Sequence, residues 1–129
     1  MRAVVLTAFT GLDGLQLSEV PDPSPGEGEV LVQIRAASLG PWDVAGAQGA
    51  FAGTGGSSEF PQVQGWDFAG ETADGRRVAG FVAQPWMGAG AFAERISVPQ
   101  GILADVPDGL GFPEASAIPV CGLTARPRR

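Results

Sequence analysis

The chain has 129 residues and a net charge of −6, and hydrophobic residues make up 44% of it. This length and apolar content predict one globular domain that buries roughly two-thirds of its surface, and they exclude a disordered chain. The acidic balance argues against binding along a nucleic-acid backbone, which requires a basic face.

The first half of the chain predicts short strands joined by glycine- and proline-rich connections. Residues 2–6 are expected to form a strand, with residues 15–20 as its hairpin partner. Side chains alternate in character over residues 29–38, which is the clearest strand signal in the chain. Residues 41–48 begin with proline and precede a glycine, so one or two helical turns are expected there. Residues 50–59 are rich in glycine and serine and predict an irregular connection.

Residues 61–70, Pro-Gln-Val-Gln-Gly-Trp-Asp-Phe-Ala-Gly, predict a turn that carries a carboxylate into an apolar segment. Gly65 and Gly70 allow a positive φ or a close backbone approach. Asp67 lies between two aromatic residues and needs a hydrogen-bond partner if it is buried. From these residues alone, Asp67 is better interpreted as a structural anchor, with a role in a binding site as the alternative.

The second half of the chain continues with short elements. Residues 73–75 predict a tight turn into a strand over residues 77–82, and residues 84–90 predict a loop. A second alternating segment, residues 92–98, predicts another strand, and residues 112–118 predict a short helix. Many short strands with one or two short helices are typical of a small β-barrel or sandwich.

The compartment is predicted from cysteine use and from the N-terminal segment. The single cysteine, Cys121, excludes an intrachain disulfide and fits a reducing cytoplasm. No apolar run is long enough to span a membrane, and the N-terminal residues predict a strand instead of a signal peptide. We therefore expect a cytoplasmic protein without a membrane partner.

Residues 88–93, Gly-Ala-Gly-Ala-Phe-Ala, match the letters of the dinucleotide-binding fingerprint G-x-G-x-x-A. That fingerprint works only between a strand and a helix, because the helix N-terminus meets the pyrophosphate. Here the glycines follow a predicted loop and lead into a predicted strand. The sequence therefore predicts no dinucleotide-binding unit at this position.

Several blocks occur in an order that resembles one enzyme superfamily. Gly-Trp-Asp-Phe-Ala-Gly at residues 65–70 looks like the Gly-x-Asp/Glu-x-Ala-Gly segment of the medium-chain dehydrogenases/reductases. More narrowly, the chain resembles the zinc-free quinone oxidoreductase branch, which includes zeta-crystallin and the enoyl reductases. The other matching blocks lie at residues 1–5, 26–32, 41–43, 90–94, 106–110 and 118–125. The resemblance implies a mainly β, GroES-like, partly open barrel over residues 1–125, followed by a tail of residues 126–129 outside the family pattern.

The resemblance implies the catalytic-domain half of an NADPH-dependent oxidoreductase that reduces a quinone or an enone or enoyl acceptor. In the resembled enzymes a dinucleotide-binding domain follows the segment that matches residues 121–125. Here Arg-Pro-Arg-Arg follows instead, so we expect a half that is inactive alone and works with a separate dinucleotide-binding domain or as a homo-oligomer. The alternative is a stand-alone GroES-like binding module without catalytic activity, or a truncated gene product.

The resemblance also assigns candidate site residues. The strip 39–43 would line the floor beneath the nicotinamide, with a threonine near its ring, so the cofactor-binding candidates are Gly40, Pro41, Asp43 and Thr124. Aromatic and sulfur-containing side chains in predicted loops would wall an apolar acceptor pocket, or pack in the core; they are Trp42, Phe51, Trp86 and Met87. Asp43 is equally well interpreted as a helix or turn cap. No catalytic residue is assigned, because water can protonate the reduced product.

A zinc site is excluded because the chain lacks the side chains that would bind the metal. The zinc-dependent branch of the family has Cys and His at the positions of Gly40 and Trp66. This chain contains no histidine, and its one cysteine lies elsewhere, so it offers no tetrahedral protein-supplied zinc site.

The resemblance carries an expectation about packing as well. In the resembled enzymes this domain packs against the dinucleotide-binding domain and against chain that returns from the C-terminus. Without those partners, apolar surface near residues 112–123 is expected to be exposed, and the protein is expected to associate.

Overall fold

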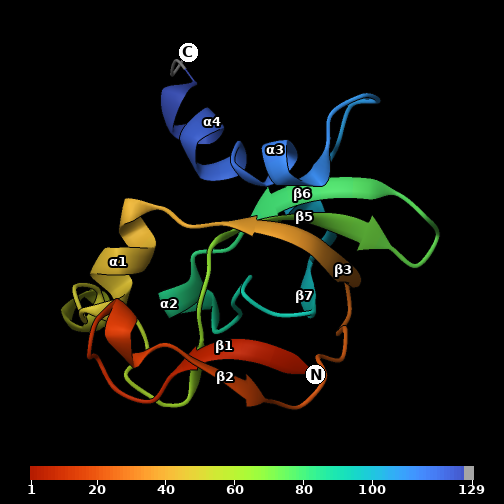
Figure 1. Ribbon diagram of the computed structural model, residues 1–129. Coiled ribbons are helices and arrows are strands. Elements are labelled where there is room, and N and C mark those ends of the chain that lie inside the picture. Colours follow the sequence, from red (N-terminus) through yellow and green to blue (C-terminus); the bar gives the residue numbers. More distant parts are fainter. Residues whose placement is uncertain (127–129) are drawn as a thin grey trace.

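The computed structural model describes residues 1–126, in which eight strands form two antiparallel sheets (Figure 1). The smaller sheet has the order β2-β1-β4, so β1 lies in the middle. Its strands are β1 (Arg2–Leu6), β2 (Gln16–Glu19) and β4 (Gln62–Val63). The predicted hairpin between residues 2–6 and 15–20 is thus confirmed, with Val4 opposite Leu17.

The larger sheet has the order β7-β3-β5-β6-β8 and does not close on itself. Its central strands, β3 and β5, are paired on both sides. The expectation of a mainly β, partly open arrangement is confirmed. The five strands are β3 (Glu29–Ser38), β5 (Asp67–Thr72), β6 (Arg77–Phe81), β7 (Arg95–Pro99) and β8 (Ala104–Asp105).

Four short α-helices occur within the described part of the chain: α1 (Pro41–Ala47), α2 (Gln84–Met87), α3 (Phe112–Ser116) and α4 (Pro119–Ala125). The sequence predicted α1 and α3 but not the other two. Each of the four has proline in its first turn, a position that suits proline because its missing N–H would lack a helical partner there. In Figure 1, α3 and α4 lie on the side of the larger sheet away from β1 and β2.

The prediction of a turn over residues 61–70 is wrong for its second half. The segment from Asp67 onward is the central strand β5, bonded to β3 on one side and β6 on the other. The change of direction comes earlier, at Gly65, where φ is +100° and a side chain would collide with the backbone of Phe92. The expected loop at 84–90 is also wrong in part, since α2 occupies its first half and ends at Gly88, with φ of 70°.

The two sheets are joined by the segment before β7. The predicted strand 92–98 begins only at Arg95 as a member of the larger sheet. Its first residues reach the smaller sheet instead, where Val4 N–H donates to the Phe92 carbonyl at 2.8 Å. The main hydrophobic core is formed by Val32, Phe68, Val78, Val82, Ala91, Ile96 and Val98. The predicted tail 126–129 lies, apart from Arg126, outside the described residues.

Gly70 lies opposite an irregularity in β3. The register between β3 and β5 shifts between Ile34 and Ala36, so that Arg35 is an extra residue on β3. A Cβ built on Gly70 would lie 2.0 Å from the Gln33 carbonyl oxygen. That contact is with backbone, which cannot rotate away, so the pairing of the two central strands requires glycine here.

Replacement of Gly70 by alanine should therefore destabilise the fold. We expect Gly70→Ala to lower the free energy of unfolding by about 3 kcal/mol, the upper end of the usual overpacking effect. Gly101→Ala is the matched control, because a Cβ there meets nothing within 4 Å. Urea unfolding of both variants tests the point, and equal midpoints would contradict it.

Candidate active site

Asp67 ties the larger sheet to the C-terminal helices. Its carboxylate is only 1% exposed, and Oδ1 accepts a hydrogen bond from the Val120 N–H at the start of α4, at 2.9 Å. A second hydrogen bond between the larger sheet and the C-terminal helices runs from Ser38 Oγ, at the end of β3, to the Ser116 carbonyl of α3, at 3.0 Å. Burial raises the pKa of Asp67, and the hydrogen bond from the Val120 N–H opposes that rise. The geometry fits the anchor interpretation of this acid.

Asp43 is a second buried acid, near Asp67. It is 5% exposed on α1, and its Oδ2 accepts a hydrogen bond from the Gly40 N–H at 2.8 Å. The Asp43 N–H donates in turn to the Gly40 carbonyl at 3.0 Å, so this side chain caps the helix. Burial raises the pKa of Asp43 to about 6, and the negative charge of Asp67 adds to the rise.

Four aromatic side chains gather beside these acids. Trp66 is central, with its ring centroid 5.8 Å from Phe51, 6.1 Å from Trp86 and 6.4 Å from Trp42. Phe51 and Trp86 also contact each other, at 5.2 Å. We call these residues, Trp42, Phe51, Trp66 and Trp86, the aromatic cluster. It contains all three tryptophans of the chain.

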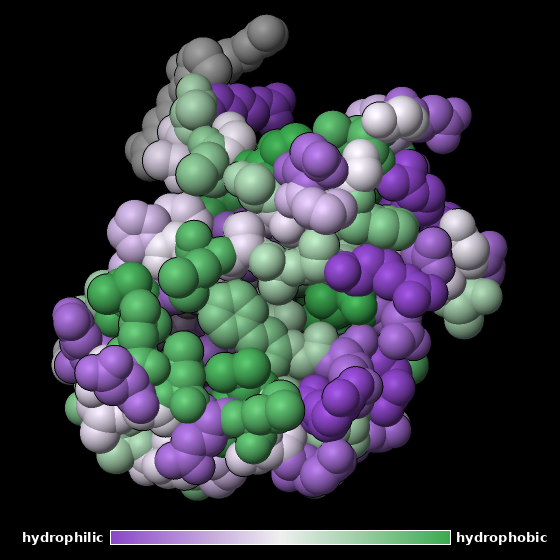
Figure 2. All heavy atoms as spheres, viewed as in Figure 1, coloured by the Kyte–Doolittle hydropathy of each residue, from purple (hydrophilic) through white to green (hydrophobic). Residues whose placement is uncertain are grey.

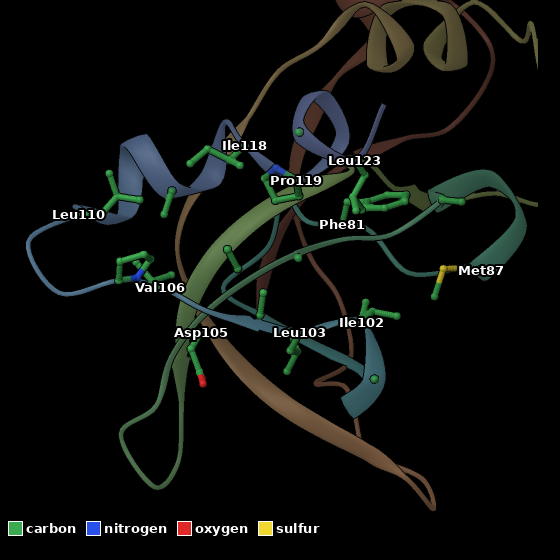
Figure 3. Close-up of a pocket in the computed structure, with 18 residues that line it drawn as sticks. Phe81, Met87, Ile102, Leu103, Asp105, Val106, Leu110, Ile118, Pro119 and Leu123 are labelled. Atoms are coloured by element: carbon green, nitrogen blue, oxygen red, sulfur yellow. The ribbon is translucent and has the colours of Figure 1, made fainter. Parts of the chain in front are cut away.

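The structure brings together part of the predicted site. Trp42, Phe51 and Trp86 of the expected acceptor pocket lie in the aromatic cluster, whereas Met87 points into a different hollow (Figure 3). Trp66, the fourth member of the cluster, is not among the predicted pocket residues, although it directly precedes Asp67 in the sequence. Of the cofactor candidates, Gly40, Pro41 and Asp43 begin α1, while Thr124 is exposed on α4.

The hollow that contains Met87 is an apolar groove of about 760 Å³. In Figure 3 the side chains of α4 and β6 lie on one side and those of residues 102–103 on the other. Ile118 and Leu123 at its rim are 51% and 57% exposed, as expected for apolar surface near residues 112–123. The other large apolar side chains that line the groove are Phe81, Met87, Ile102, Leu103, Val106 and Leu110. Sequence reasoning did not identify the groove, because its walls come from segments far apart in the chain.

A smaller hollow of about 360 Å³ lies between β1 and β3. Arg2 and Glu94 form an ion pair at its border, at 3.1 Å. Figure 2, viewed from this side, shows hydrophobic side chains over the middle and left of the face and hydrophilic ones along its right side. None of the predicted site residues lines this hollow.

Residues 1–126 lack the features of several other kinds of site. This part of the chain contains no group of three or more His, Cys, Asp or Glu side chains arranged to hold a metal ion. Nor does it contain a helix of the length and hydrophobicity needed to cross a membrane. The glycines of residues 88–93 follow helix α2 and precede strand β7, an order that does not form the pyrophosphate cradle of a dinucleotide site.

Taken together, the two sheets, the short helices and the helix-capping acid define a GroES-like β domain. No protein-family profile matches the chain. It is 32% identical to the mouse synaptic vesicle membrane protein VAT-1 homolog-like, over 97% of this chain and 30% of that protein. It is 31% identical to the NADPH-dependent alkenal/one oxidoreductase of Arabidopsis thaliana chloroplasts, over 97% of this chain and 36% of that protein.

Solved structures agree with these relatives. The quinone oxidoreductase of Thermus thermophilus, also solved as its complex with NADPH, matches with a TM-score of 0.82 and 37% identity. That match covers 97% of this chain and 38% of the other. The resemblance to the medium-chain dehydrogenase/reductase superfamily, in its quinone oxidoreductase branch, is thereby confirmed. The chain spans 30% and 36% of the length of the two relatives named above.

The raised pKa of Asp43 predicts a pH-dependent stability. The folded chain holds a proton on Asp43 up to about pH 6, whereas the ordinary pKa is 3.8, so the folded state binds more protons between these values. The contribution of Asp43 to the free energy of unfolding should therefore fall as pH rises from about 4 to about 6. Asp43→Asn, which keeps an oxygen for the Gly40 N–H, removes that contribution, so the slope of its free energy of unfolding against pH should be more positive than that of the wild type.

Chemical unfolding at several pH values measures this slope. Asp108→Asn, at an exposed position, is the control and should retain the wild-type slope. An Asp43→Asn slope equal to that of the wild type would show that Asp43 does not carry the effect.

Proposed function

We propose that this chain binds the acceptor in an NADPH-dependent reduction of a quinone or an enone. The observation that carries the proposal is the aromatic cluster, which lies beside two buried acids in a domain related to quinone and alkenal oxidoreductases. A flat, neutral, conjugated ring is the ligand that tryptophan and phenylalanine faces suit best, by stacking and by burial of apolar surface.

The proposed part of this chain in the reaction is to orient the acceptor and to exclude water from it. NADPH, when bound, supplies a hydride, and a proton from water completes the reduction of the acceptor. The aromatic rings hold the acceptor plane in place for that transfer.

The four cofactor candidates do not suit a nicotinamide contact equally well. Pro41 and Thr124 are exposed and are proposed as contacts to the nicotinamide. Gly40 lies beneath the indole of Trp42, and Asp43 is buried with one oxygen bonded as a cap. We therefore assign Gly40 and Asp43 to the support of the site, and leave direct contact with the cofactor to the other two.

The binding of NADPH itself is assigned to a dinucleotide-binding domain outside the described residues. The relatives are about three times as long as the stretch that this chain matches, which supports a further domain as the partner. The apolar groove beneath α4 is the surface proposed to pack against it, since its exposed rim residues Ile118 and Leu123 gain from being covered.

Acceptor binding can be read from intrinsic fluorescence, because every tryptophan of the chain lies in the aromatic cluster. We expect menadione to quench this fluorescence saturably and NADPH alone to leave it unchanged. Phe51→Leu should weaken menadione binding about fivefold through loss of one aromatic contact. Phe9→Leu is the matched control, since Phe9 pairs with Phe60 outside the cluster.

Two results would contradict the proposal. The absence of saturable quenching would show that the cluster holds no quinone. Equal menadione affinities for Phe51→Leu and Phe9→Leu would place the quinone elsewhere. Saturable binding without menadione reduction, after the remaining two-thirds of a related oxidoreductase is fused to the chain, would favour a binding module without catalytic activity.

A further inference from the structure

The indole of Trp42 lies directly on Gly40. A Cβ built on Gly40 would fall 2.2 Å from Cζ2 of that ring, 2.3 Å from Cε2 and 2.7 Å from Cη2. These distances are far below any real contact, so the ring uses space that every residue except glycine would fill with its own side chain. The six-membered part of the indole is the far end of a side chain that can rotate, and the contact can be relieved by that rotation.

Trp42 is also the least anchored ring of the cluster. Its Nε1 is buried and has no hydrogen-bond partner among residues 1–126. The Trp86 Nε1 donates, by contrast, to the Thr54 carbonyl at 3.2 Å. Trp42 contacts one other ring, Trp66, at 6.4 Å, which is the longest aromatic separation in the cluster. A buried N–H without an acceptor destabilises the position that the ring occupies.

Asp43, the next residue, also has a buried polar atom without a hydrogen-bond partner. Asp43 Oδ1 is buried without a partner, although its Oδ2 caps the helix. Within the described part of the chain, these two are the side-chain polar atoms that are both buried and unbonded. Their occurrence on consecutive residues concentrates the unfavourable free energy at one point, the start of α1. Rotation of the Trp42 ring would relieve the first of these, since it lets water reach Nε1.

We propose that the Trp42 indole is a movable cover of the acceptor site. It lies on Gly40 in this structure, and it turns away when a flat, neutral acceptor such as a quinone stacks against Trp66. The inference rests on the proposed function, because it names the acceptor as the ligand that moves the ring. It adds a specificity-determining role for Trp42: the cover admits planar ligands and excludes acceptors too thick to lie between the two indoles.

The test uses the whole chain labelled with 5-fluorotryptophan. Its three ¹⁹F resonances are assigned by Trp42→Phe, Trp66→Phe and Trp86→Phe in turn. Gly40→Ala should shift the Trp42 resonance, because the new methyl group displaces the ring, and should leave the other two in place. Gly53→Ala is the matched control, since a Cβ there meets nothing within 4 Å, and it should shift none of them. A Trp42 resonance that Gly40→Ala leaves unmoved overturns the inference.

Menadione titration of the labelled wild-type chain provides the second arm, and it does not depend on how well Gly40→Ala folds. We expect the Trp42 resonance to move toward its position in Gly40→Ala as menadione binds. Shifts at Trp66 and Trp86 with none at Trp42 would overturn the cover and leave the proposed function intact. A titration that shifts no resonance would overturn the proposed function, and the inference with it.

Discussion

The hydrogen bond from the Val120 N–H to Asp67 is the constraint on which this structure depends most. A buried acid that is 1% exposed requires a hydrogen-bond partner, and the Val120 N–H supplies one to Oδ1, while burial raises the pKa of Asp67. The bond fixes the start of α4 against the start of the central strand β5. It also places Asp67 near enough to Asp43 to raise the pKa of that acid, which couples α1 to the same point.

Two apolar surfaces on the domain have different chemical character. The aromatic cluster offers tilted and edge-on rings near two buried acids, which suits a small conjugated acceptor. The groove beneath α4 is lined mainly by aliphatic side chains together with Phe81 and Met87, and the one carboxylate at its edge, Asp105, points away and pairs with Arg76 at 2.9 Å. A surface without polar groups to orient a small ligand suits a packed protein domain better. This contrast supports the two proposed roles, in which the aromatic cluster binds the acceptor and the groove packs against a further domain.

Local patterns predicted much of the fold. Alternation indicated the observed bounds of β3, and the glycine at position 70 indicated a close backbone approach that the structure places opposite an irregularity of β3. The helices α2 and α4 were not predicted because one or two turns carry little periodicity, and only the proline at each start indicated them. The site was harder to predict. The sequence did not assign Trp66 to the acceptor pocket, and it grouped Met87 with aromatic residues from which the structure separates it. The side of a loop that a side chain faces depends on tertiary contacts, which local patterns do not reveal.

The most direct test of where the acceptor binds is amide chemical-shift mapping of the ¹⁵N-labelled chain with menadione. This account predicts that the shifts cluster at Trp42, Phe51, Trp66 and Trp86, and that residues of the groove such as Leu103 and Leu123 remain in place. Shifts confined to the groove would contradict the account, since they would make the groove the acceptor site and the aromatic cluster a part of the packing.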